Sequence, residues 1–437
     1  MSKMKVLLVR PYYGVNVSSD MSGDFGHFEY IGAISPDLGI VFGATILEKC
    51  GNKVKVYDCN AIRMKPNSFF SEISKEKELD IIIVKVSAPT ILLDISFAEH
   101  LKEKFKKVKI IIAGHPTLYL KNNLQINSKY IDEVISIPLE EYCYFLATGK
   151  DNNISINDFP SPNYTLFPYQ YYKERTGKNI AFLWGSRGCI MNCAYCPYKQ
   201  FYGTIDKRSN EKILEDIKSI YRLGITTLQF RDPFFTYDIK KTIDLCKKII
   251  DSNIKIEWYC DTRIDSLTDE VIEWLYRSGC RMLFVGIESA SENILSKYSR
   301  KKFEVLDLKN KILKLRNMGI RVMGLYMIGF PDESLDDIKN TYDFAEEINT
   351  DYIHFNPYIP YPYNTNMNPE EFDKVVNRKS NVCKKIFNSE IDFLSQQLDF
   401  AYSMKRIGLK ESLKIYEFQN FMKKRSMRIS NNMQEIS

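Results

Sequence analysis

The sequence contains no uninterrupted apolar run long enough to form a membrane-spanning helix. Its first apolar stretch, Met4–Pro11, is too short for the hydrophobic region of a secretory signal and is interrupted by Arg10. A net charge of +6 over 437 residues is small, so the composition does not favour a nucleic-acid-binding protein. We therefore expect a cytoplasmic protein without a membrane or nucleic-acid partner.

The sequence also lacks a disulfide framework, an internal repeat and a low-complexity tract. Its ten cysteines are scattered, apart from three that lie close together, and such scatter is typical of a reducing compartment. No Gly-x-Gly-x-x-Gly follows the first predicted strand, so a dinucleotide site is poorly supported. With 44% hydrophobic residues the chain can form a full core, and its length suffices for two domains and an appendage.

The three clustered cysteines are Cys189, Cys193 and Cys196, in the spacing Cys-x3-Cys-x2-Cys. The run Ile180–Trp184 before them is typical of a buried strand, and two glycines after this run allow a sharp turn. We therefore expect the thiols on a loop at the carboxyl end of a strand. That edge of the sheet carries the chemistry in parallel-sheet enzymes.

Three thiolates on one short loop suit a soft metal centre. A [4Fe–4S] cluster normally takes four cysteine ligands, so three would leave one iron open to another ligand. A structural zinc site would need a second pair of ligands to follow, and the sequence has no such pair. Three unliganded core cysteines are a further interpretation, although such close spacing seldom arises by chance. We therefore favour an iron–sulfur cluster.

Downstream of the cysteines, predicted strands alternate with predicted helices. Apolar stripes and terminal glycines predict helices over 210–223, 239–253, 268–278, 303–318 and 335–348. Apolar runs predict strands over 180–184, 226–231, 255–260, 282–287, 321–328 and 352–357. Six such units fit a βα barrel or part of one, although alternation alone does not distinguish a partial barrel from an open sheet.

The first 150 residues show a similar alternation. Strands are predicted over 5–9, 53–57, 80–86, 109–113 and 131–135, and helices over 36–50 and 92–105. The nearly continuous apolar run over 80–86 is typical of a central parallel strand. These elements predict a Rossmann-like, doubly wound α/β sheet, which binds ligands beyond the carboxyl ends of its strands.

Cys189, Cys193 and Cys196, with the aromatic Tyr195 between the last two, resemble the signature of the radical S-adenosylmethionine (radical SAM) superfamily. The resemblance implies a partial βα barrel and a [4Fe–4S] cluster held by the three cysteines. It also implies that the open iron chelates the methionine part of S-adenosylmethionine, with Tyr195 near the adenine. Reductive cleavage would then give a 5′-deoxyadenosyl radical that removes a hydrogen atom from the substrate.

The same resemblance implies further S-adenosylmethionine contacts at the ends of successive strands: Asp232, Arg263, Glu288, Ser289 and Gly329. Asp232 stands where the superfamily often has Gly-Gly-Glu and would contact the methionine amino group. Arg263 would bind the carboxylate or the ribose, and the backbone at Gly329 would contact the adenine. Plainer interpretations stay open, because Asp232 could cap the next helix and Arg263 could form a surface ion pair.

The first predicted domain resembles the cobalamin-binding domain of cobalamin-dependent radical SAM enzymes. The resemblance rests on the helix over 36–51, the Ser-x-x-Thr at Ser87–Thr90 and the Gly-His-Pro-Thr at Gly114–Thr117. It implies cobalamin contacts at residues that follow the strands: Asn60, Ser87, Thr90, Gly114 and His115. A lone histidine such as His115 is, however, more often satisfied by a backbone hydrogen bond.

Two features depart from the cobalamin pattern. Asp58-Cys59-Asn60 stands where cobalamin mutases and methionine synthases carry a cobalt-binding histidine, although many radical SAM relatives also lack that residue. The glycine-acid-glycine turn found in many relatives is absent from 133–140. A domain that keeps the fold and binds no corrin therefore remains an alternative.

These observations predict a Rossmann-like domain over 1–150, a linker over 151–179, a partial barrel over 180–366 and a helical region over 367–437. The expected function is cobalamin-dependent methylation of an unactivated carbon of a small-molecule substrate. An electron donor such as flavodoxin or ferredoxin would reduce the cluster. Rearrangement, cyclisation or oxidation without methyl transfer is the first alternative, and a non-catalytic metal-binding scaffold is the second.

Overall fold

The structure of the chain, a computed structural model, divides into two compact units. Unit 1 comprises Met1–Asn179, Pro362–Asn377 and Phe418–Ser437, and unit 2 comprises Ile180–Tyr361 and Arg378–Glu417. The structure describes residues 3–14, 16–17, 28–29, 35–76, 78–120, 130–150, 154–177, 179–299, 304–359, 361, 368–376, 398–399 and 402.

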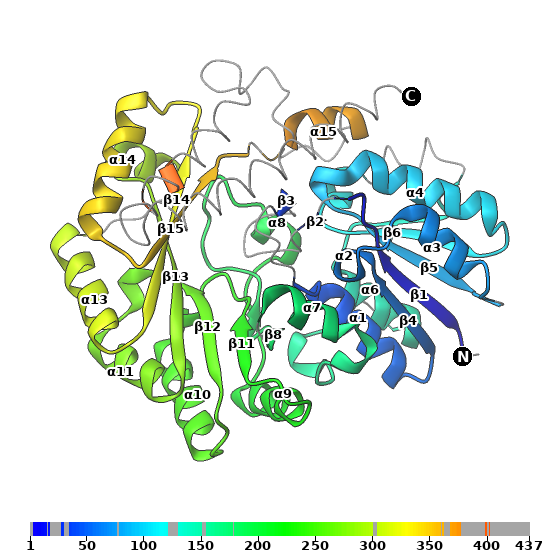
Figure 1. The fold of residues 1–437 in the computed structure, drawn as a ribbon, viewed down its shortest axis with the longest axis horizontal. Coiled ribbons are helices and arrows are strands. Elements are labelled where there is room, and N and C mark those ends of the chain that lie inside the picture. Colours follow the sequence, from blue (N-terminus) through cyan, green and yellow to red (C-terminus); the bar gives the residue numbers. More distant parts are fainter. Residues whose placement is uncertain are drawn as a thin grey trace. The chain divides into compact units, whose positions relative to one another are not determined.

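Unit 1 is built on a five-stranded parallel sheet with the order β4-β1-β5-β6-β7 (Figure 1). Its strands are β1 (Lys5–Arg10), β4 (Lys53–Asp58), β5 (Ile81–Lys85), β6 (Lys109–Ala113) and β7 (Glu133–Ile135). β5 is buried along its whole length, as expected for a strand with helices on both faces. The strand order reverses between β1 and β5, and open α/β sheets bind their ligands at such a switch point.

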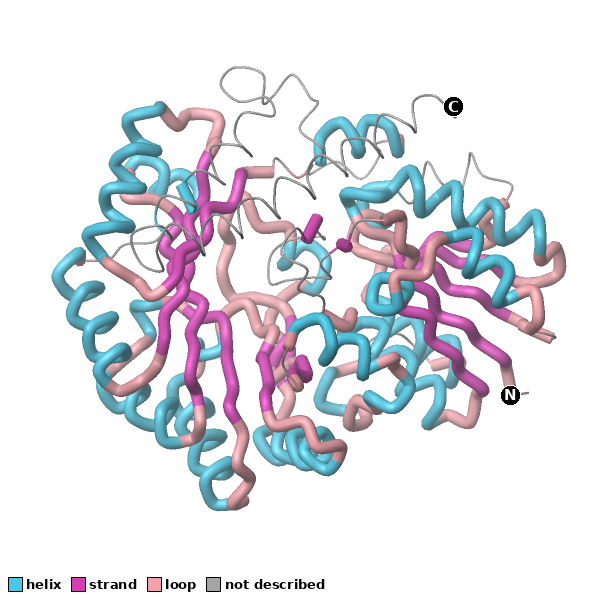
Figure 2. The backbone as a smooth tube through the Cα atoms, viewed as in Figure 1, coloured by secondary structure: helices cyan, strands magenta, loops and turns pink. Residues whose placement is uncertain are grey.

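Helices cover both faces of this sheet (Figures 1 and 2). α1 (Leu38–Lys49) and α6 (Leu139–Thr148) pack on one face, and α3 (Pro66–Ile73) and α4 (Ile91–Lys104) pack on the other. Asp37 caps α1 by accepting the Ile40 N–H at 2.9 Å. Gly43 permits the close approach of α6, because an added Cβ would lie 2.9 Å from the Cys143 sulfur.

Shorter elements complete unit 1. They are β2 (Asn16–Val17), β3 (Phe28–Glu29), α2 (Cys59–Ile62), α7 (Tyr169–Thr176), α15 (Pro369–Val376) and the 3-10 turns η1 (Ala88–Thr90), η2 (Ile156–Asp158) and η3 (Tyr164–Leu166).

Residues 154–177, expected to belong to a connector, pack against α1 as part of unit 1. Asn163 donates its backbone N–H to Thr45 Oγ1 at 2.9 Å. The rings of Phe159 and Phe42 have centroids 5.7 Å apart. A composition rich in Asn, Ser and Pro indicated a connector here. It could not show that this segment would pack on a helix far earlier in the chain, since 118 residues separate Asn163 from Thr45.

Unit 2 is built on a six-stranded parallel sheet with the order β15-β14-β13-β12-β11-β8, so each strand pairs with the next one along the chain. Its strands are β8 (Ile180–Leu183), β11 (Thr227–Phe230), β12 (Glu257–Thr262), β13 (Cys280–Glu288), β14 (Arg321–Ile328) and β15 (Tyr352–Pro357). β8 and β15 form the two edges of the sheet, so the six strands do not close into a complete barrel.

The main helices of unit 2 lie along one face of this sheet (Figure 1). They are α9 (Asn210–Arg222), α10 (Ile239–Asp251), α11 (Asp269–Arg277), α13 (Val305–Asn317) and α14 (Leu335–Ile348). On β13, Leu283 and Val285 are fully buried, whereas the alternating Met282 and Phe284 are half-buried. Side chains of the two faces thus alternate along the strand, as the pleat requires.

The remaining elements of unit 2 are short. They are β9 (Ser186–Arg187), β10 (Asp206–Lys207), α8 (Tyr198–Tyr202), α12 (Glu292–Ile294), the 3-10 turns η4 (Phe235–Tyr237) and η5 (Ile264–Ser266), and the π-turn η6 (Leu295–Ser299).

The predicted fold class, an α/β chain with a doubly wound sheet followed by a partial barrel, is confirmed. β14, β15 and α14 begin and end at the predicted residues. The sequence analysis missed α3 and α6, which have only 8 and 10 residues, so that a helical period is barely visible in them.

Most of the predicted C-terminal helical region, including Phe387, Ile391 and Leu394, lies outside the described residues. The described part contains α15, whose buried Phe372 stacks on Tyr119 of unit 1 at 5.6 Å. Among the described helices, none combines the length and the apolar content that crossing a bilayer requires.

A buried ion pair in unit 2 provides a test of the fold. Arg208 donates to Asp216 through Nε at 2.5 Å and through Nη2 at 2.9 Å, and each side chain is only 1% exposed. Asp216→Ala would leave a buried guanidinium without its counter-charge, so we expect the free energy of unfolding to fall by about 3–5 kcal/mol. Urea unfolding followed by circular dichroism measures the change.

Glu215→Ala is the matched control, because it removes the exposed pair between Lys212 and Glu215 on the same helix. Its expected effect is below about 1 kcal/mol. Equal losses in the two variants would contradict the assignment of the buried pair.

Candidate active site

The three cysteines lie on the loop that follows β8 and β9, at the carboxyl edge of the sheet of unit 2. Gly188 makes the turn into this loop with a φ of 80°, and an added Cβ would lie 2.2 Å from the backbone oxygen of Thr204. Only glycine fits there. Cys189 then donates its backbone N–H to the Gly203 carbonyl at 3.4 Å. The backbone that carries the first thiol is therefore held in one place.

None of the three thiols is in a disulfide, and all three are half-buried. Burial raises the pKa of Cys189 and raises the pKa of Cys196 to about 12, so binding of a metal centre would release their protons. Among the described residues, no three Cys, His, Asp or Glu side chains converge on a single metal ion. A cluster does not need such convergence, because each cysteine binds a different iron.

The far end of the cysteine loop contacts the connections that follow two other strands. Ala194 donates its backbone N–H to the Tyr298 carbonyl at 2.8 Å. Tyr195 packs against a buried cluster formed by Ile294, Tyr298 and Phe330, and its ring lies 6.1 Å from that of Phe330. Tyr298 lies on η6, in the connection after β13, and Phe330 follows β14. The loop is thus held by aromatic packing along the carboxyl edge of the sheet.

Glu288 ends β13 in a left-handed conformation, with a φ of 72°. This conformation is uncommon and strained for a residue other than glycine. The register with β14 shifts between Gly286 and Glu288, which marks a bulge. Burial, and then the charge of Glu288, raise the pKa of the Tyr195 phenol. The irregular backbone therefore brings a carboxylate next to the aromatic residue of the cysteine loop.

Arg263 follows β12 and lies close enough to Cys189 for its positive charge to oppose the burial that raises the pKa of that thiol. Its Nε and Nη2 pair with Asp265 at 2.6–3.2 Å, as the plainer interpretation anticipated. Its Nη1 is buried and has no hydrogen-bond partner among the described residues. A buried guanidinium N–H without a partner suits an anionic ligand group.

Glu333 is a site residue that the sequence analysis missed. Its Oε2 accepts the backbone N–H groups of Gly329 at 2.5 Å and Phe330 at 3.2 Å. Burial raises the pKa of this carboxyl to about 7, although both hydrogen bonds oppose the shift. Glu333 thereby holds the turn after β14, where the adenine contact is predicted. The signal in the sequence was an acid four residues after a strand-ending glycine.

Two predicted S-adenosylmethionine contacts, Asp232 and Ser289, already form side-chain hydrogen bonds with other residues of the chain. Asp232 accepts the Gly185 N–H at 2.7 Å and the Ser186 hydroxyl at 2.6 Å. Burial raises the pKa of Asp232 to about 7 against these hydrogen bonds. Ser289 is fully buried, and its Oγ lies 3.1 Å from Thr341 Oγ1 on α14. Neighbouring elements therefore already hold the side chains of both predicted S-adenosylmethionine contacts.

In unit 1, Asp94 joins two loops at the switch point of the sheet, a role that the sequence analysis missed. Its carboxylate accepts the Ser87 backbone N–H at 2.9 Å, the Thr90 hydroxyl at 2.8 Å and the Tyr13 hydroxyl at 2.9 Å. Tyr13 follows β1, whereas Ser87 follows β5. Burial raises the pKa of Asp94 to about 7. The Ser87 hydroxyl has no hydrogen-bond partner in the part of the chain that the structure describes.

The other predicted cobalamin contacts shape the strand ends of unit 1. Asn60 accepts the Val17 N–H at 3.0 Å and donates to a backbone carbonyl after β1 at 2.7 Å. Gly114 has a φ of 153°, and an added Cβ would lie 2.4 Å from the Val86 oxygen. His115 is buried beside it. The glycine is therefore required by the neighbouring strand end, independently of any ligand.

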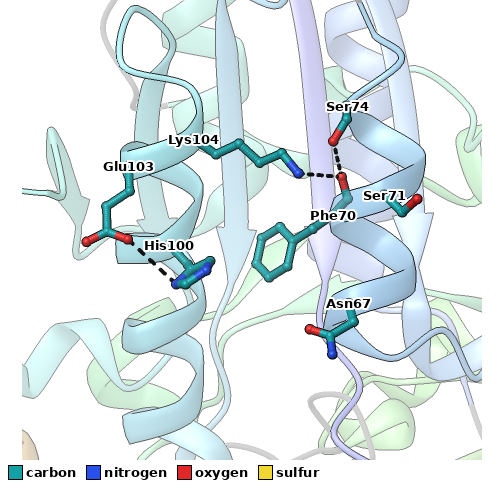
Figure 3. A pocket seen from close by; sticks show the side chains of 7 residues that line it. All are labelled: Asn67, Phe70, Ser71, Ser74, His100, Glu103 and Lys104. Atoms are coloured by element: carbon teal, nitrogen blue, oxygen red, sulfur yellow. Dashed lines mark hydrogen bonds and ion pairs between the residues drawn. The ribbon is translucent and has the colours of Figure 1, made fainter.

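An open pocket of about 690 Å³ lies between α3 and α4 of unit 1 (Figure 3). Several of its polar groups interact: His100 Nδ1 lies 3.7 Å from Glu103 Oε2, and Lys104 Nζ donates to the Phe70 carbonyl at 3.0 Å. The pocket belongs to the helix layer and not to the carboxyl ends of the strands, so it is distinct from the predicted cobalamin edge.

Residues 185–345 match the family model of the radical SAM superfamily. A similar curated sequence is the uncharacterized methyltransferase PH0819 of Pyrococcus horikoshii. It is 25% identical over 393 residues, which cover 83% of this chain and 82% of the relative.

Two solved structures share the fold. The methyltransferase TsrM from Kitasatospora setae, with cobalamin and a [4Fe–4S] cluster bound, has a TM-score of 0.63 and 14% identity over 83% of this chain and 74% of its own. The cobalamin-dependent enzyme OxsB, with aqua-cobalamin and S-adenosylmethionine bound, has a TM-score of 0.65 and 17% identity over 88% of this chain and 56% of its own. The chain therefore contains a domain of the radical SAM superfamily over residues 185–345, and this domain carries the cysteine loop at the sheet edge.

Proposed function

We propose that the chain is a cobalamin-dependent radical SAM methyltransferase that acts on an unactivated carbon of a small molecule. The observation that carries the proposal is the cysteine loop. It holds three thiols outside any disulfide, at the carboxyl edge of a six-stranded parallel sheet and close to a guanidinium and a carboxylate. A methyltransferase among the similar sequences supports methyl transfer as the reaction.

In this proposal Cys189, Cys193 and Cys196 hold a [4Fe–4S] cluster, because three thiolates on one loop are the donors that such a cluster takes. When reduced by a donor such as flavodoxin or ferredoxin, the cluster would supply the electron that cleaves S-adenosylmethionine. The half-buried thiols lie on a loop fixed at both ends, so the chain itself sets the position of the ligands.

Four residues around the loop would bind S-adenosylmethionine. The Glu288 carboxylate suits the ammonium of the methionine part, and the buried Nη1 of Arg263 suits its carboxylate. The ring of Tyr195 and the backbone at Gly329 would contact the adenine. The aromatic cluster beside them would exclude water from the site.

Unit 1 would hold cobalamin at the carboxyl edge of its sheet, at the switch point between β1 and β5. Bound cobalamin would supply the methyl group, received from a second S-adenosylmethionine. Asp94 keeps the loops after β1 and β5 in one arrangement, and the Ser87 hydroxyl stays available for a ligand. Asn60, Gly114 and His115 complete the proposed contacts, with Thr90 beside Ser87.

Replacing Cys193 and Cys196 together by alanine tests the cluster. After anaerobic reconstitution with iron and sulfide, the unaltered chain should carry about four irons per molecule, with thiolate-to-iron absorption in the visible range. The double variant should keep iron only at background level, because one thiolate cannot retain the cluster. Cys50→Ala, which changes an exposed cysteine of unit 1, is the control and should load fully. Full iron content in the double variant would refute the assignment.

Reconstitution with hydroxocobalamin tests the methyl-transfer proposal. We expect about one cobalt per chain together with about four irons, and turnover with substrate should give a methylated product and S-adenosylhomocysteine. Four irons with cobalt at background, and 5′-deoxyadenosine without S-adenosylhomocysteine, would refute methyl transfer. That result would favour rearrangement, cyclisation or oxidation on the same fold.

Asp94→Ala tests the ordering of the cobalamin edge. The variant leaves a backbone N–H and two hydroxyls without their acceptor, so we expect the Kd for hydroxocobalamin to rise at least about tenfold. Iron content should not change. Glu103→Ala, on the exposed part of the same helix, is the control and should bind cobalamin normally. An unchanged Kd in Asp94→Ala would show that the edge does not depend on this carboxylate.

A further inference from the structure

We propose that Asp232 is a positioning residue that holds the entry of the cysteine loop, and that it is not a ligand of the S-adenosylmethionine ammonium. The inference rests on the proposed cluster and S-adenosylmethionine site. It assigns a different role to the carboxylate that stands where the superfamily often has the acid of Gly-Gly-Glu.

The hydrogen bonds of Asp232 continue the pairing of β8 with β11 beyond the end of the sheet. The last backbone bond of this ladder runs from the Arg231 N–H to the Leu183 carbonyl at 2.8 Å. Beyond it, the Asp232 side chain replaces the backbone as acceptor. Its Oδ1 accepts the Gly185 N–H at 2.7 Å, and its Oδ2 accepts the Ser186 hydroxyl at 2.6 Å. Two consecutive residues that lead into the loop are therefore bound by one carboxylate.

The peptide at Gly185 is held from its other side as well. Its carbonyl accepts the Arg208 N–H at 3.0 Å. An added Cβ at Gly185 would lie 3.1 Å from Asp232 Oδ2 and 3.3 Å from Ile213 Cδ1, so the close approach depends on the glycine. Gly185 lies four residues before Cys189. Asp232 thus fixes the peptide from which the chain runs on to the first thiol.

Burial distinguishes the two roles that a carboxylate could have here. Asp232 is 2% exposed, and both of its oxygens already accept hydrogen bonds from the chain. An ammonium group would have to reach it through the loop that it holds. Glu288 lies beside Tyr195, on a strained strand end that directs its side chain toward the cysteine loop. Glu288 is therefore the carboxylate that suits the ammonium.

Two substitutions at Asp232 separate these roles. Asp232→Asn keeps the shape: its Oδ1 can accept the Gly185 N–H, and its Nδ2 can donate to the Ser186 oxygen. It removes the charge and reverses the direction of the hydrogen bond with Ser186. Asp232→Ala removes both hydrogen bonds. A positioning role therefore predicts that asparagine rescues the defect of alanine, whereas an ammonium ligand requires the charge.

The experiment measures two quantities on the full chain, reconstituted without oxygen. One is the retention of iron during titration with a chelator, and the other is the Kd for S-adenosylmethionine by equilibrium dialysis. We expect the apparent affinity of Asp232→Ala for iron, measured in the chelator titration, to fall about 10- to 100-fold. Losses of this size follow the removal of residues that orient metal ligands. Asp232→Asn should match the unaltered chain in both measurements.

Asp238→Ala is the matched control, because it removes a carboxylate from the same connection between β11 and α10. It should retain iron normally. If Asp232→Asn keeps its iron but its Kd for S-adenosylmethionine rises more than about tenfold, the charge binds the ligand and the proposal is overturned. Normal iron retention in a folded Asp232→Ala variant would also overturn it. If Asp232→Ala does not fold, Asp232→Asn decides alone.

Failure of the proposed cluster can be distinguished from failure of the positioning role of Asp232. An unaltered chain that binds no iron refutes the cluster itself and this inference with it. An unaltered chain that binds about four irons, with Asp232 variants that behave against expectation, refutes only the positioning role.

Discussion

Buried carboxylates that accept hydrogen bonds from backbone N–H groups hold the strand ends of both units. They are Asp94, Asp232 and Glu333, each no more than 2% exposed. Each accepts at least one N–H group of a residue that has left the sheet, where no neighbouring strand supplies an acceptor. The loops that carry the proposed cobalamin, cluster and adenine contacts therefore take their shape from one kind of interaction.

Burying these carboxylates costs free energy. A buried carboxylate loses hydration, and burial raises the pKa of Asp94, Asp232 and Glu333 to about 7 in spite of their hydrogen bonds. A core made only for stability would place apolar groups at these positions. Acids in these places, like the strained φ of Glu288, are typical of sites where a loop must keep one geometry.

Both units would bind their proposed ligands at the same part of a parallel sheet. In unit 1 the strand order places the switch point between β1 and β5, and in unit 2 the strands follow one another so that every carboxyl end lies along one edge. Cofactors carry the difficult chemistry in such enzymes, and the protein binds, orients and shields them. Fixed loops with aromatic neighbours, such as Tyr195 against Phe330, suit that task.

The sequence by itself determined the order and type of most elements and the position of the cysteine loop. Apolar periods, terminal glycines and the spacing of three cysteines are local features, so β14, β15 and α14 could be predicted to the residue. Only the tertiary structure decided which acids would turn inward. Asp232 binds Gly185 across 47 residues, and Asp94 binds Tyr13 across 81. Such pairings arise when strands distant in the chain come together, and no local pattern records them.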